Sequence, residues 1–73
     1  MTARELEILG LLVEGWPNGR VAAGLVVAER TVATHLEHIL HKLQVPTRTA
    51  AVALALRLGL YVPPPITLGQ NRA

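Results

Sequence analysis

The chain has 73 residues, a net charge of +2 and no cysteine. This length allows one small domain, which buries only about 60% of its unfolded surface, and the absence of cysteine excludes disulfides and fits a reducing compartment. The apolar runs are shorter than the roughly 20 residues of a membrane span, and the start MTARELEIL is unlike a signal peptide. We therefore expect a soluble, cytoplasmic protein.

The first two predicted helices cover residues 3–14 and 19–25. Thr2 and Glu5 have the spacing of a capping box. Apolar residues then recur at helical spacing until Gly15, at Leu6, Leu9, Leu12 and Val13. Pro17-Asn18-Gly19 interrupts the pattern, and a short helix is expected to follow, since proline is tolerated at a helix start.

The third predicted helix covers residues 29–43. Its apolar residues share one face at about 100° per residue, so we expect this stripe to be buried: Val32, Leu36, Ile39, Leu40 and Leu43. The opposite face is polar, with Arg30, Thr34, Glu37, His38 and His41, and has Ala33 and Lys42 on its flanks. Pro46 ends the helix, because the residue before a proline avoids the α region.

The fourth predicted helix covers residues 48–58. Thr47 can cap its start, and Gly59 is typical of a left-handed stop. We expect its core face to consist of Ala51, Val52, Ala55 and Leu58. Pro63-Pro64-Pro65 forbids further helix. The predicted fold is therefore all-α, a compact four-helix domain over residues 1–61, followed by a mobile tail over residues 62–73.

Residues 18–38 have the plan of a helix-turn-helix, in which a short helix and a turn over residues 26–28 precede a longer helix. In that plan the second helix enters the major groove and its first residues contact base edges. Small residues there, Ala33 and Thr34, would allow a close approach. A polar outer face is also compatible with a merely solvated surface.

A collinear pattern of residues from Thr2 to Leu60 makes the helix-turn-helix interpretation more specific. It comprises T-x-R-E-x-E-I-L from Thr2 to Leu9, then Gly15, Asn18, Ala22, Leu25, Thr31-Val32, His35, Ile39, Lys42-Leu43, Val45, Arg48, Ala51-Val52, Ala55 and Gly59-Leu60. In this pattern the chain resembles the DNA-binding domain of LuxR-type (GerE-like) transcriptional regulators. The resemblance implies that the third helix reads the major groove of double-stranded DNA and that the fourth helix forms a homodimer. It also implies a regulatory receiver or ligand-binding domain in a longer parent chain.

The DNA-binding residues follow from this resemblance. We expect four residues to contact the DNA backbone and so to position the domain: Arg20, Arg30, Thr31 and Lys42. We expect Thr34, Glu37 and His38 to lie nearest the bases, beside Ala33. Glu37 either repels phosphate or accepts a hydrogen bond from cytosine N4.

The chain also departs from the family pattern at five positions. Pro17 stands where the family usually has Ser, and Arg20 where it often has an acidic residue. Ala28 stands where the family has Ser or Thr, and loss of such a helix cap typically costs about 1 kcal/mol. Ala33 stands where Lys is common, and Glu37 where a basic or polar residue is frequent. These departures favour an alternative function, a helix-turn-helix that has lost DNA affinity and acts as a protein-interaction or dimerisation module.

The three histidines do not predict a metal site, because His35, His38 and His41 progress around the helix rather than sharing one side. We expect His35 to be a packing residue with a satisfied ring nitrogen. No phosphate loop or nucleophile motif is present, so neither an enzyme nor a cofactor is predicted.

The fourth helix carries apolar residues outside its expected core stripe. Ala50 and Leu54 cannot share the side of Ala51 and Ala55, and Arg57 borders them. A second copy of the same helix would cover this surface. We expect a weak homodimer through Ala50, Leu54 and Arg57, because one short helix offers less than the roughly 1,200 Å² of a stable interface.

Overall fold

The computed structural model describes residues 1–62. They form four helices: α1 (Ala3–Val13), α2 (Asn18–Leu25), α3 (Glu29–Leu43) and α4 (Arg48–Leu58). No strand occurs within these residues. The all-α prediction is confirmed, and each helix lies within one residue of its predicted bounds. Of the expected tail, residues 63–73 lie outside the described residues.

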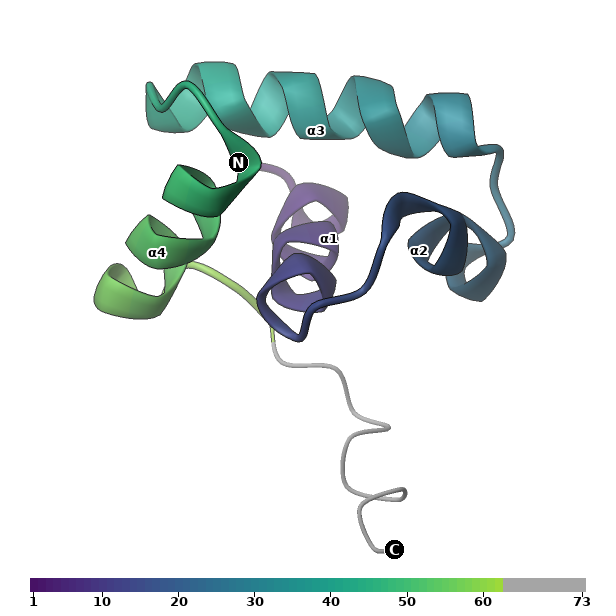
Figure 1. Ribbon diagram of the computed structural model, residues 1–73, viewed down its shortest axis with the longest axis horizontal. Coiled ribbons are helices and arrows are strands. Elements are labelled where there is room, and N and C mark those ends of the chain that lie inside the picture. Colours follow the sequence, from purple (N-terminus) through teal and green to yellow (C-terminus); the bar gives the residue numbers. More distant parts are fainter. Residues whose placement is uncertain (63–73) are drawn as a thin grey trace, which may run out of the picture.

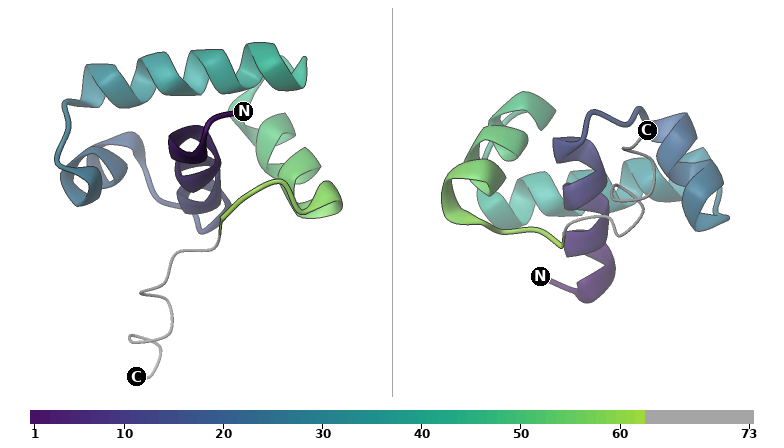
Figure 2. Two further views of the ribbon diagram at one scale, coloured as in Figure 1. Left: turned by 180° about the vertical axis from the view of Figure 1, so that it is seen from behind. Right: turned by 90° about the horizontal axis from the view of Figure 1, so that it is seen from below.

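The helix α3 lies along one side of the molecule, and α1, α2 and α4 lie together on its other side (Figures 1 and 2). Each of these three helices packs against α3, and α1 also packs against α4. Within the described residues, no helix combines the length and the apolar character that a membrane crossing requires.

The core between the helices consists of aliphatic side chains only. Trp16 and Tyr61 are half-buried at its edge. The buried residues come from all four helices: Ile8, Leu9, Leu11, Leu12, Val21, Ala22, Val32, Ile39, Ala51 and Ala55. Small side chains on α4 let that helix approach α1 and α3 closely, which is consistent with a core built without phenylalanine.

One residue of the expected core is exposed. Leu58 lies on the side of α4 that carries Ala51 and Ala55, but it is 59% exposed. Ala55 is the last buried residue of α4, and Leu58 follows it by almost one helical turn. The periodicity gave the direction of this side chain correctly. Direction alone does not determine burial, because the spacing does not show which part of α4 its neighbouring helices cover.

The two outer helices have side-chain caps, whereas the two helices of the helix-turn-helix have none. The Thr2 hydroxyl accepts from the backbone N–H of Glu5 at 3.1 Å, and the Thr47 hydroxyl accepts from that of Ala50 at 3.1 Å. Pro17 and Ala28 precede α2 and α3 without a capping hydrogen bond. The missing caps at these two positions, expected from the sequence, are confirmed.

The turn between α2 and α3 contains a valine in the left-handed conformation. Val26 has φ 57° and ψ 50°, and its side chain is 87% exposed. This conformation typically costs a residue with a Cβ atom about 1–2 kcal/mol. The backbone N–H of Val27 donates to the carbonyl of Ala22 at 3.0 Å, which closes the end of α2.

The segment after α4 returns to α1. The backbone N–H of Val62 donates to the carbonyl of Leu6 at 3.3 Å. Gly10 is buried beneath it, and a Cβ atom at Gly10 would collide with the carbonyl oxygen of Val62. Glycine is therefore needed here for close approach of two backbones, and Val62 belongs to the folded domain.

The side chain of Glu5 links α1 to the far end of α3. Its Oε1 atom accepts from the backbone N–H of Thr2 at 2.9 Å and from Lys42 Nζ at 2.8 Å, while the carboxylate itself is almost fully buried. The hydrogen bond from Lys42, followed by that from Thr2, lowers the pKa of Glu5 from its ordinary 4.5 to about 2. The expected capping box is thus confirmed, and it also carries an ion pair between helices.

This lowered pKa predicts a specific acid sensitivity. A carboxylate with a depressed pKa stabilises the fold fully above pH 4.5, and this contribution is lost as the pH falls toward 2. Glu5→Gln can still accept from the Thr2 N–H, but it removes the charge that pairs with Lys42. We expect a melting temperature lower by a few degrees at pH 7, and a weaker dependence of melting temperature on pH between 4.5 and 2.

Thermal melts followed by circular dichroism over this pH range measure the effect. Glu14→Gln is the matched control, because it makes the same change at an exposed position of α1's end. Equal pH profiles for Glu5→Gln and the parent chain would contradict the proposed role of the carboxylate.

Candidate nucleic-acid interface

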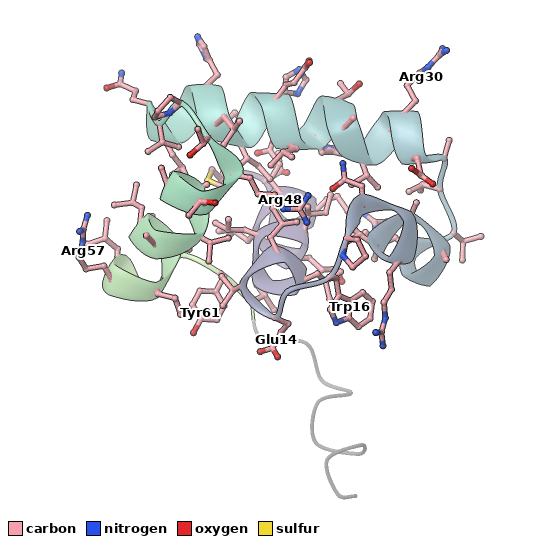
Figure 3. The ribbon with its side chains drawn as sticks, in the orientation of Figure 1. Glu14, Trp16, Arg30, Arg48, Arg57 and Tyr61 are labelled. Carbon is pink, nitrogen blue, oxygen red and sulfur yellow. The ribbon has the colours of Figure 1, made fainter. Side chains whose placement is uncertain are left out.

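The outer face of α3 is a polar surface that no other helix covers. On the inner face Val32 and Ile39 are fully buried, and Leu36, Leu40 and Leu43 are half-buried. The residues of the outer face are all exposed: Arg30, Thr31, Ala33, Thr34, Glu37, His38 and His41. Figure 3 shows Arg30 projecting from the side of α3 that faces away from the other helices.

Six of the eight expected DNA-binding residues therefore share this outer face. They are Arg30, Thr31, Ala33, Thr34, Glu37 and His38. Its charge is mixed, since Arg30 is cationic and Glu37 is anionic, and small uncharged side chains lie between them. Such a face can approach a ligand closely, and it offers a hydroxyl, a carboxylate and an imidazole for hydrogen bonds.

The structure places the other two expected residues in internal contacts. Lys42 is directed to Glu5, although 44% of its side chain is exposed. The guanidinium of Arg20 lies 4.4 Å from the centroid of the Trp16 ring. Figure 3 shows Trp16 on the side of the molecule opposite the outer face of α3, so Arg20 does not belong to that face.

Sequence reasoning assigned no role to Arg48, which makes two long-range hydrogen bonds. Its guanidinium donates to Asn18 Oδ1 at 2.7 Å and to the backbone carbonyl of Trp16 at 2.5 Å. These contacts join the start of α4 to the start of α2. The sequence signal was a cation in the first turn of a predicted helix, where the helix dipole disfavours it.

His35 occupies the border between the two faces of α3. It is half-buried, as expected for a packing residue, but its Nδ1 atom is buried without a hydrogen-bond partner. The expectation of a satisfied ring nitrogen is therefore wrong for Nδ1. The helical geometry explains this result, because the neighbouring residues of the stripe are aliphatic.

The apolar surface of α4 is arranged on more than one side. Ala50 and Leu54 are half-buried, and Arg57 is exposed. Leu56 and Leu58 are exposed by 58% and 59%. In Figure 3 Arg57 projects away from the body of the molecule.

Among residues 1–62, no group of three His, Cys, Asp or Glu side chains is arranged to hold a metal ion. The outer face is therefore described by its hydrogen-bonding and charged groups alone.

Comparisons with known proteins agree with this geometry. Residues 1–55 match the family described as bacterial regulatory proteins, luxR family. The transcriptional regulatory protein DegU of Brevibacillus brevis is 37% identical over 59 residues, which cover 81% of this chain and 25% of DegU. The response regulator protein VraR of Staphylococcus aureus is 42% identical over 60 residues, which cover 82% of this chain and 29% of VraR.

Two solved structures are also similar. The response regulator ChrA of a heme-sensing two-component system superposes with a TM-score of 0.77 at 49% identity, over 81% of this chain and 29% of ChrA. The transcription factor GerE superposes with a TM-score of 0.77 at 35% identity, over 85% of this chain and 92% of GerE. These relatives are regulators rather than enzymes, and the chain spans between a quarter and a third of the length of DegU and VraR. The chain belongs to the luxR family of bacterial regulatory proteins.

Proposed function

We propose that the chain binds double-stranded DNA in a sequence-specific manner, with the outer face of α3 in the major groove. The observation that carries this proposal is the exposure of one whole side of α3, while the other three helices pack on its opposite side. A helix in the major groove needs such a face, because base edges can be contacted only by side chains that no neighbouring helix covers. The proposal is supported by two relatives, because DegU is named as a transcriptional regulatory protein and GerE as a transcription factor.

Within this proposal, Thr34, Glu37 and His38 lie nearest the bases, and Ala33 allows the helix to approach. Arg30 and Thr31 contact the DNA backbone at the start of α3. Lys42 and Arg20 stay candidates for phosphate contacts, but each would first have to leave the partner that it has in the free domain, Glu5 or the Trp16 ring.

The family relation supports two further parts of the proposal. The names of VraR and ChrA as response regulators favour a parent chain in which a receiver domain controls this DNA-binding domain. We also propose a weak homodimer through Ala50, Leu54 and Arg57 of α4, which would place two outer faces on half-sites about one helical turn apart. The cytoplasm is the expected location, because the ligand is DNA.

One observation favours a second function. The outer face carries the carboxylate of Glu37 beside an alanine, and α3 begins without a cap. A domain with these features could instead bind a protein through α3 or α4. Titration against random duplex DNA at low salt distinguishes the two functions, since every groove binder shows an affinity that falls with salt.

A second carboxylate on the outer face, placed at Thr34 beside that of Glu37, should strongly weaken DNA binding. Thr34 is exposed, so Thr34→Asp leaves the core unchanged, and we expect the affinity to fall more than about tenfold, because a charge is placed against the bases. Fluorescence anisotropy with a duplex selected from a random library measures this affinity. Thr49→Asp is the matched control, since Thr49 is exposed on α4. Unchanged binding by Thr34→Asp would favour the protein-interaction function.

The role of Glu37 is tested by reversing its charge. If the carboxylate repels phosphate, Glu37→Lys raises the affinity for random DNA and steepens its salt dependence, with a slope change of about 0.9 for each added phosphate contact. Glu14→Lys makes the same change on the side of the molecule opposite the outer face of α3 and should alter the slope less (Figure 3). A lower affinity of Glu37→Lys for every sequence would contradict the account in which Glu37 repels phosphate.

The proposed dimer is tested with two separate substitutions to glutamate, on different sides of α4. Leu54→Glu should weaken self-association and cooperative binding to a duplex with two half-sites, measured by sedimentation and anisotropy. Leu56→Glu introduces the same charge at an exposed position outside the proposed interface and should leave both unchanged. Dissociation by Leu56→Glu alone would place the interface on the other side of α4, and a monomeric parent chain at high concentration would exclude the dimer.

A further inference from the structure

Arg48 occupies the first position of α4 and reaches across the molecule to the start of α2. Its two terminal nitrogens donate to two different acceptors, the side-chain oxygen of Asn18 and the backbone carbonyl of Trp16. Figure 3 shows the side chain extending from α4 toward α2. A planar guanidinium suits this arrangement, because it holds both acceptors in one fixed geometry, which a single ammonium group cannot do.

The position of Arg48 is unfavourable for α4 itself. The N-terminus of a helix carries a partial positive charge, so a cation is disfavoured in its first turn. The first turn of α4 contains no acidic residue that would offset this. The local structure of α4 therefore does not explain the arginine at this position. Its hydrogen bonds to Asn18 and to the carbonyl of Trp16 explain it.

These acceptors belong to the part of the chain that begins the helix-turn-helix. Asn18 is the first residue of α2, and its side chain accepts from Arg48 while α2 has no side-chain cap of its own. The Trp16 ring lies along α2, with Cζ3 at 3.2 Å from the position of a Cβ atom at Gly24 and the ring 4.4 Å beneath the Arg20 guanidinium. Holding Trp16 and Asn18 thus holds α2 along much of its length.

Few other polar contacts fix α2. Among the side-chain hydrogen bonds of residues 1–62, those of Arg48 are the only ones that join the start of α2 to another helix. The helix α2 packs mainly against α3, the next helix in the chain. The pair α2 and α3 therefore has one polar attachment to α4 at the start of α2, and one to α1 at the end of α3 through Lys42.

We infer that Arg48 is a positioning residue for DNA recognition, which holds α2 and the start of α3 in a fixed orientation relative to α4. This inference rests on the proposed DNA-binding function. Direct readout needs donors and acceptors aligned with base edges, whereas attraction to phosphate needs little alignment. Loss of the Arg48 link should therefore reduce discrimination between sequences more than it reduces affinity for DNA in general.

The test compares two duplexes of equal length, one selected by the parent chain from a random library and one with the selected sequence scrambled. Arg48→Ala and Asn18→Ala should each lower the affinity for the selected duplex about tenfold, within the range of coupling found in shared hydrogen-bond networks. Affinity for the scrambled duplex should change less than about twofold. The double variant should lose no more than Arg48→Ala alone, and Arg48→Lys should recover part of the discrimination.

Circular dichroism and thermal melts establish that each variant is folded at the temperature of the binding measurement. If Arg48→Ala does not fold, Arg48→Lys and the uncharged change Asn18→Ala still give the comparison. Arg4→Ala is the control for the loss of one positive charge, because Arg4 pairs only with Glu7 on the surface of α1. It should leave the ratio of the two affinities unchanged.

Unchanged affinities for both duplexes in Asn18→Ala and in the Arg48 variants would overturn the inference and leave Arg48 with a structural role only. Equal losses on both duplexes, with a salt slope reduced by about 0.9 in Arg48→Ala, would instead show a direct phosphate contact and overturn it too. If the parent chain selects no sequence from the random library, the proposed function itself is contradicted. This result can be distinguished from the two outcomes above, which require a parent chain that does select a sequence.

Discussion

The buried stripe of α3 is the surface on which α1, α2 and α4 pack. Val32 and Ile39 have no exposed surface, and they contact a core made only of leucine, isoleucine, valine and alanine. A helix that buries one stripe against three neighbours leaves its opposite side free. The exposure of Thr34 and Glu37 therefore follows from the packing of the core. A residue of the outer face can change without loss of core contacts, which is the property that a variable recognition surface requires.

Polar contacts between helices complement this apolar packing. Lys42 ties the end of α3 to Glu5, and Arg48 ties the start of α4 to Asn18. Hydrogen bonds in which one partner is charged are shorter and stronger than neutral ones. In a domain whose core is small, two such links at opposite ends of the α2–α3 pair can determine how that pair sits on α1 and α4.

The helices and the outer face of α3 could be predicted because local signals determine them. Thr2, Thr47 and Gly59 mark helix ends through contacts within a few residues, and the period of the apolar residues shows which side of α3 is buried. The polar links could not be predicted, since Lys42 and Glu5 are 37 residues apart in the sequence. An outward lysine is equally compatible with a phosphate or with a carboxylate on another helix, and only the packing of α1 on α3 decides between them.

The valine in the turn between α2 and α3 has a consequence for how this sequence can change. Val26 adopts a left-handed conformation that glycine or asparagine accepts more readily, and its side chain is almost fully exposed. Proteins tolerate destabilising substitutions only while they stay above a threshold of stability. A change at Val26 that relieves the backbone strain would raise stability without touching the core or the outer face of α3. Such a change would increase the margin of stability within which the exposed residues of α3 can vary.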